Sequence, residues 1–218
     1  MMQRFTSFDF GLTGLAALFH QDWNHIGEVE QVVLTYLSVG EESCADDALK
    51  KEAAELERDV SLLISSPLSD YQLRLLWVMA TGGNYPFSNG ETGRGFLERI
   101  HAASRQWQQG YGVVEADAAQ GWNSVHVASD VRKAIDGTPL NLPDECRMYF
   151  DSDVHVLRNA LDNCARSASA ELAFRLLLRI HLANFIPVEG VYWATYARIA
   201  REFALGEDLL SSLEFLAS

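Results

Sequence analysis

Apolar residues recur every three to four positions through most of this chain, the spacing that places them on one face of a helix. Ser69 followed by Gln72 forms a capping box, which predicts a helix start. The Thr-Gly-Gly-Asn stretch at 81–84 predicts where that helix ends, because glycine and asparagine accept the left-handed backbone needed there. The predicted helices of the N-terminal half cover residues 29–37, 46–64, 69–80 and 96–107.

Between residues 108 and 141 glycines interrupt the pattern, and helical periodicity is weak. Residues 111–114 and 125–127 are candidates for short strands, although neither alternates over enough positions to predict one firmly. Helical spacing returns over residues 154–164, 172–183, 192–203 and 209–216. The sequence therefore predicts an all-α helical bundle of eight or nine helices in two packed subdomains. Its expected parts are an N-terminal helical domain (1–110), a connecting segment (111–140) and a C-terminal helical subdomain (141–218).

Charge narrows the choice of partner. The 218 residues include 30 acids against 17 lysines and arginines, for a net charge of −13. Such a field repels nucleic acid and anionic membranes and speeds encounter with a basic protein. We therefore expect a protein partner, with no nucleic-acid or membrane binding.

The three cysteines (Cys44, Cys146 and Cys164) have no paired spacing, and an odd number leaves at least one thiol unpaired. The N-terminus lacks the sustained apolar region of an export signal. No apolar run approaches the roughly 20 residues of a membrane span. These features predict a cytoplasmic protein with reduced thiols.

Enzyme chemistry finds little support in the residue pattern. No nucleophile motif, zinc-binding HExxH sequence or phosphate-binding glycine loop is present, so we expect neither catalysis nor a cofactor. His20, Asp22 and His25 are suitable ligand types for a divalent metal. On a helix, however, the two histidines would lie about 140° apart, and no fourth ligand is evident. A metalloenzyme using these three residues remains the third hypothesis.

Acidic residues form two clusters. Residues 28–70 contain eleven acids against three bases, and like charges one helical turn apart do not favour folding. The alternative is a solvated helix face that only keeps the protein soluble. The first candidate contact set is Glu41, Glu42, Asp46, Asp47, Glu52, Glu55 and Asp59. The second is Asp144, Glu145, Asp151 and Asp153, which flank aromatic residues.

Five segments resemble the immunity proteins of bacterial contact-dependent growth inhibition systems. They are Phe-His-Gln-Asp-Trp at 19–23, the helix around 32–34, the helix start at 68–73, the glycine pair at 82–83 and the helix at 96–100. The likeness covers roughly residues 5–107, and Phe96 stands where the family usually has tryptophan. The C-terminal half matches no family in this way.

This resemblance implies a bacterial cytoplasmic protein that binds one cognate toxin, and many such toxins are nucleases. A nuclease needs a basic groove for phosphates, so an acidic inhibitor can occupy that groove. We expect an RNase before a DNase. Within the motif, Phe19, Gln21, Asp22 and Trp23 are assigned to structure before contact. The main alternative is a helical adaptor that recognises a protein or peptide in a groove between helices, with weak salt dependence.

Overall fold

The computed structural model describes residues 9–38, 46–111, 125–140 and 154–217. Within these ranges the fold is an all-α bundle of ten α-helices and two short 3-10 helices, without strands. The elements are α1 (Gly11–Ala17), η1 (Trp23–His25), α2 (Val29–Ser38), α3 (Asp46–Ser65), α4 (Asp70–Ala80), α5 (Gly93–Gly110), α6 (Val125–Gly137), α8 (Val154–Ser167), α9 (Ala170–Ala183), α10 (Gly190–Glu202), α11 (Glu207–Ser211) and η2 (Glu214–Leu216).

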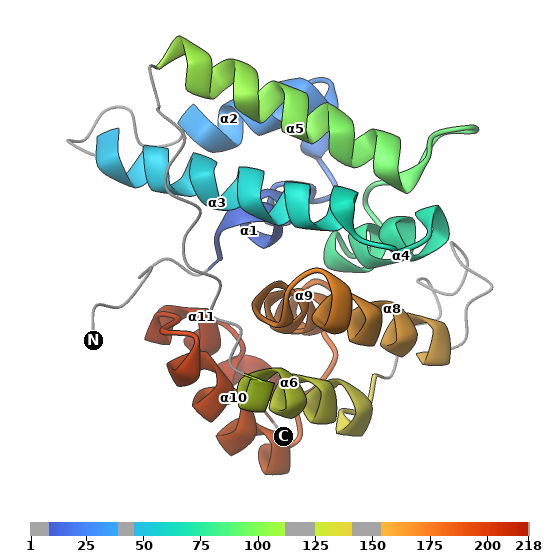
Figure 1. Cartoon of the computed structure of the whole chain (residues 1–218), viewed down its shortest axis with the longest axis vertical. Helices are drawn as coiled ribbons and strands as arrows, with labels where there is room; N and C mark the ends of the chain where they lie inside the picture. The colour runs from blue at the N-terminus through green and yellow to red at the C-terminus, as the bar shows by residue number, and fades with distance from the viewer. Residues whose placement is uncertain (1–8, 39–45, 112–124, 141–153, 218) are drawn as a thin grey trace.

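The helices stack in successive layers along the long axis of the molecule (Figure 1). At one end α5 runs beside α3 and α2, and α1 packs beneath α3. In the middle α4 contacts both α8 and α9, and α1 also reaches α9. At the other end α6 packs on α8, α9 and α10. Helix α9 therefore joins the two halves of the sequence.

The local signals for helix ends are confirmed. The Ser69 side chain accepts a hydrogen bond from the Gln72 amide, and the Gln72 side chain accepts one from the Ser69 amide, which completes the capping box of α4. Gly82 and Gly83 have φ values of 62° and 80°, the left-handed conformation expected after α4. A Cβ at Gly82 would lie 2.6 Å from the carbonyl oxygen of Ala183. Glycine at this position therefore also lets α4 and the end of α9 approach closely.

The middle of the chain contains a helix where the sequence showed only weak periodicity. The candidate strand at residues 125–127 is the first turn of α6, and residues 125–140 pack as part of the C-terminal helices. The candidate strand at 111–114 lies almost wholly outside the described residues. Helix α6 has 13 residues and no acid in its first turn, so the sequence offered few signals of where it begins.

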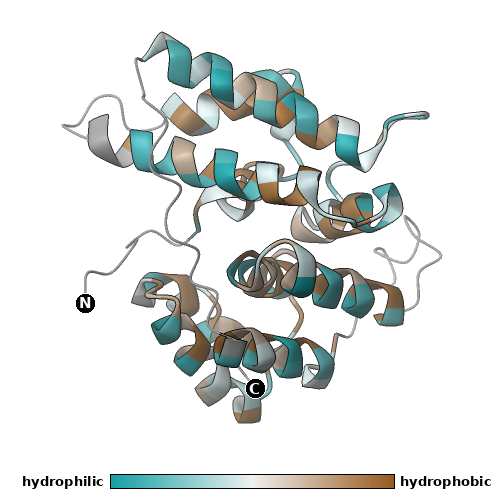
Figure 2. Cartoon of the chain, in the orientation of Figure 1, coloured by the Kyte–Doolittle hydropathy of each residue, from teal (hydrophilic) through white to brown (hydrophobic). Residues whose placement is uncertain are grey.

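One hydrophobic core includes buried residues from both halves of the sequence. Figure 2 shows hydrophilic and hydrophobic residues alternating along most helices, as expected of amphipathic helices packed round such a core. The predicted division into domains 1–110 and 141–218 stays a prediction. Among the described helices, none is long and apolar enough to cross a membrane.

Aromatic side chains fill the core of the N-terminal half. The ring of Tyr85 lies 5.6 Å from that of Phe19, 5.4 Å from Trp23 and 4.6 Å from Phe96. Trp77 lies 5.2 Å from Phe19 and 4.9 Å from Phe96. These five rings, which we call the aromatic cluster, join Phe19 and the start of η1 to α4, α5 and the loop between them.

Candidate functional site

The first acidic set is only partly on the surface. Asp59 is completely buried and Glu55 is nearly so, which makes the expectation of a solvent-facing acidic side wrong for these two residues. Glu52 is half-buried. A buried carboxylate requires a charged or hydrogen-bonding partner, and the structure supplies one from the distant helix α9.

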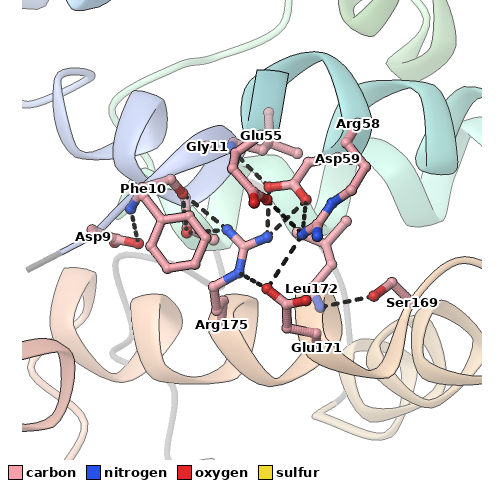
Figure 3. A network of polar contacts seen from close by, with 12 residues as sticks. Asp9, Phe10, Gly11, Glu55, Arg58, Asp59, Ser169, Glu171, Leu172 and Arg175 are labelled. Carbon is pink, nitrogen blue, oxygen red and sulfur yellow. Dashed lines mark hydrogen bonds and ion pairs between the residues drawn. The ribbon is translucent and has the colours of Figure 1, made fainter. Parts of the chain in front are cut away.

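Arg175 of α9 is that partner, and it is itself buried (Figure 3). Its Nη2 donates to both carboxylate oxygens of Asp59, at 2.7 and 2.6 Å. Its Nη1 donates to the Phe10 carbonyl oxygen at 2.9 Å and to the Thr13 hydroxyl at 3.2 Å. The guanidinium carbon also lies 4.2 Å from the centre of the Phe10 ring. One side chain thus ties α9 to both α3 and α1.

Further charges surround this ion pair, and we call the whole set the buried ion network. Arg58 Nη2 lies 2.9 Å from Glu55, 3.0 Å from Asp59 and 3.2 Å from Glu171. Glu171 also pairs with Nε of Arg175 at 3.4 Å. Each acid therefore faces at least one guanidinium, as burial of charge requires.

Asp59 of the network and the neighbouring Glu52 also cap helix α1. The first amides of a helix have no partner within the helix, and Phe10 before α1 supplies no side-chain cap. Instead the Gly11 amide donates to Glu52 at 2.7 Å and the Leu12 amide donates to Asp59 at 3.1 Å. Gly11 has a φ of +59°, and a Cβ there would lie 2.5 Å from Asp59 Oδ2. Only glycine lets α1 begin directly against these acids.

The pKa shifts differ sharply among the acids in and beside the network. Burial raises the pKa of Asp59, but Arg175 and Arg58 outweigh burial, so the net pKa lies below its ordinary value. Burial raises the pKa of Glu52 to about 7, against the opposing effects of the Gly11 amide and Arg175. Burial likewise raises the pKa of Asp9. Glu52, which also accepts a hydrogen bond from the Tyr36 hydroxyl, therefore changes its charge near neutral pH.

This arrangement joins helices rather than holding a substrate. Asp59 and Arg175 have no solvent-exposed surface in their side chains, so no outside molecule reaches the two central groups. Arg175 was not predicted as a partner of the acids. A signal was present, because arginine interrupts the apolar run 172–178 of a helix that is buried on all sides.

Of the aromatic residues in the 19–23 motif, Phe19 is buried in the core and Trp23 is partly buried against it. The Trp23 Nε1 donates to the carbonyl oxygen of Asn84 at 2.8 Å. Gln21 and Asp22 are exposed. Asp22 precedes η1 and makes no side-chain capping hydrogen bond there.

The three candidate metal ligands do not form a metal-binding group. His20, Asp22 and His25 are all exposed, and the Asp22 amide donates to His20 Nδ1 at 3.3 Å. No group of three histidine, cysteine or acidic side chains suited to a metal occurs in the parts of the chain described here. Cys164 is a free, buried thiol whose pKa burial raises to about 12, so it is not a reactive nucleophile.

Most of the remaining predicted contact residues lie outside the described ranges. These are Glu41, Glu42, Asp144, Glu145, Asp151 and Asp153. Asp46 and Asp47 begin α3, but their side chains are not described. For all eight, the role in partner contact stays a prediction.

A basic groove of about 350 Å3 lies between α6 and α8. The charged side chains that line it are Arg132, Lys133, Arg158, Arg166, Asp136 and Asp162. Asp162 accepts hydrogen bonds from Arg132 at 2.7 Å and from Arg166 at 2.6 Å. With four bases against two acids, the groove is a positive site on an acidic protein, which composition did not predict.

The described residues therefore form an all-α protein in which buried ion pairs join helices that are distant in sequence. Comparison with protein-family models, with curated proteins and with solved structures finds no match for this chain.

Proposed function

We propose that this protein is an immunity protein of a bacterial contact-dependent growth inhibition system. It binds the cognate toxin domain in the cytoplasm and blocks it without catalysis of its own. The toxin is a basic nuclease, an RNase before a DNase, and the protein covers its active site or substrate groove.

The aromatic cluster is the observation that carries this proposal. The segments that resemble the family are spread from residue 19 to residue 100, and Phe19, Trp23 and Phe96 from these segments contact one another through Tyr85 and Trp77. The likeness therefore involves residues that pack together, as a shared folded unit requires. The net charge of −13 adds support, because it favours encounter with a basic toxin.

Burial of Asp59 and Glu55 restricts which acids can meet the toxin. Both side chains are used inside the buried ion network and have almost no exposed surface. The contact therefore falls to the acids before them in sequence, Glu41, Glu42, Asp46 and Asp47, and to the second set at 144–153. To take the place of substrate phosphates, a carboxylate of the inhibitor must be able to face basic side chains of the toxin.

Co-expression tests this proposal. The C-terminal domain of the protein encoded directly upstream is produced with and without this chain, and growth and RNA integrity are scored. We expect arrest without this chain and recovery with it, together with a complex whose dissociation constant rises with salt. Growth that is unaffected by the upstream domain, or no complex, would contradict the proposal.

Charge reversal tests the acidic mechanism. Glu41→Lys with Glu42→Lys should lower the association rate about tenfold or more at low salt, because steering depends on charges near the interface. Glu202→Lys with Asp208→Lys makes the same change in net charge at two exposed positions elsewhere and should have a smaller effect. Equal effects would mean that only net charge matters.

The basic groove favours a second candidate, the helical adaptor. A positive groove between two helices suits an acidic peptide segment of another protein. Toxin protection separates the two candidates. An adaptor binds its partner through Lys133 and Arg166 but gives no protection against the upstream toxin domain. Lys133→Gln with Arg166→Gln would then abolish binding, whereas toxin neutralisation would be unaffected by this change.

A further inference from the structure

Two exposed phenylalanines lie side by side where the turn after α9 meets η2. In the described part of the chain, Phe185 and Phe215 are among the three most exposed large apolar residues, at 72% and 64%. Their rings lie 6.4 Å apart between centres. The Val188 amide donates to the Leu216 carbonyl oxygen at 2.9 Å, which holds the two segments side by side. We call these two residues the apolar patch.

The backbone makes phenylalanine an unfavourable choice at position 185. Helix α9 ends in a Schellman motif, in which the Ile186 amide donates to the His181 carbonyl oxygen at 2.9 Å. The residue before Ile186 must then take the left-handed conformation, and Phe185 has a φ of 50°. Glycine is the usual residue there, because a side chain introduces strain. Phe185 is both strained and exposed, so it contributes little to folding.

Two exposed acids belong to the same two segments as the patch. Glu189 follows the turn and Glu214 begins η2, and both are exposed. Both belong to the two segments that the Val188 hydrogen bond holds together. Aromatic anchors with a charged rim are typical of protein interfaces, and carboxylates at the rim suit a basic partner.

We infer that the apolar patch, with Glu189 and Glu214 at its rim, is a contact surface for the basic toxin domain. This inference rests on the proposed function and adds a surface from the C-terminal half, which the resemblance does not cover. The two phenylalanines act as the anchors, and the two glutamates meet basic residues around them.

Phe185→Gly separates binding from folding, because glycine relieves the strain while removing the anchor. We expect its melting temperature to equal or exceed that of the wild type. With Phe215→Ser added, we expect the dissociation constant for the upstream toxin domain to rise at least tenfold. Ala204→Gly is the matched control, since Ala204 has a φ of 54° at the corresponding position after α10. It should leave the affinity unchanged.

The outcomes separate the two proposals. If the wild type neutralises the toxin and the double variant binds it as tightly, the contact surface lies elsewhere and this inference is wrong, whereas the proposed function stands. If the wild type neither binds nor neutralises the toxin, both fail. Light scattering after gel filtration supplies the third outcome. A wild-type dimer that the double variant converts to a monomer would assign the patch to a second copy of this chain, which would overturn the inference.

Discussion

Arg175→Met should destabilise the protein strongly. The substitution removes both hydrogen bonds to Asp59 and those to Phe10 and Thr13. It leaves a buried carboxylate without its main partner, and breaking a buried ion pair in this way costs about 3–5 kcal/mol. Arg58 remains 3.0 Å from Asp59, so we expect a loss of unfolding free energy of about 3 kcal/mol or more.

The exposed ion pair between Arg198 and Asp130 provides a matched control. Its atoms are 2.7 Å apart, nearly the same distance as in the buried pair, but the Arg198 side chain is 45% exposed. Exposed pairs contribute about 0–1 kcal/mol, so Arg198→Met should lose no more than that. Urea unfolding followed by circular dichroism, extrapolated to water, measures both variants. Equal losses for the two arginines would refute the reasoning, because burial would then have no effect.

Lower pH gives an independent check on Arg175→Met. In the wild type the pKa of Asp59 is lowered overall because the two arginines outweigh burial, so its pairing stabilises the fold above the ordinary pKa of 3.8. In the variant, burial without Arg175 should raise that pKa. Protonation then removes the buried charge, and the deficit relative to wild type should shrink as the pH falls toward 4. A deficit that does not depend on pH would mean that lost packing, rather than charge, causes it.

Three further changes test the capping, the core and the turn. Glu52→Gln keeps an acceptor for the Gly11 amide without charge. Because the pKa of Glu52 is raised from 4.5 to about 7 in the folded protein, the wild type should lose about 3 kcal/mol of unfolding free energy relative to this variant as the pH rises through that range. Parallel urea titrations would contradict this if the difference between the two proteins were the same at every pH. Phe19→Ala should cost about 3–5 kcal/mol by opening a cavity in the aromatic cluster, measured by thermal unfolding, and a loss under about 1 kcal/mol would mean that the rings repack. Gly82→Ala should destabilise the protein by at least about 1 kcal/mol through left-handed strain, since Gly82 has a φ of 62° and a Cβ there would meet Ala183. In the same melting experiment the control Gly110→Ala, whose Cβ meets nothing within 4 Å, should be neutral or slightly stabilising.

Signals within one helix were enough to predict most of the fold. The capping box at Ser69, the glycine pair at 82–83 and the apolar spacing of α3 and α5 depend on residues a few positions apart, so the sequence shows them directly. Helix α6 was missed because no acid marks its first turn and glycines interrupt the chain before it. Local pattern, where it is strong, predicts local structure.

The site was less predictable because its residues meet from a distance in sequence. Asp59 lies 116 positions from Arg175, and nothing local to α3 distinguishes a buried carboxylate from an exposed one. The better signal was on the other partner: a charged residue within the apolar helix α9 cannot be buried unpaired. The strain at Phe185 was unpredictable for a different reason. It depends on the exact residue at which α9 ends, and sequence alone does not fix helix ends to one residue.

The link from Asp59 to Arg175 also bears on how the chain folds as it is synthesised. At roughly 5–20 residues per second, the 116 residues between them take on the order of 6–23 s to translate. During that interval the acids of α3 have Arg58 but lack the guanidinium of Arg175, and α1 lacks its contact with α9. We therefore expect the N-terminal helices to stay loosely packed until α9 is synthesised. Their native packing would then form late and in a single cooperative step.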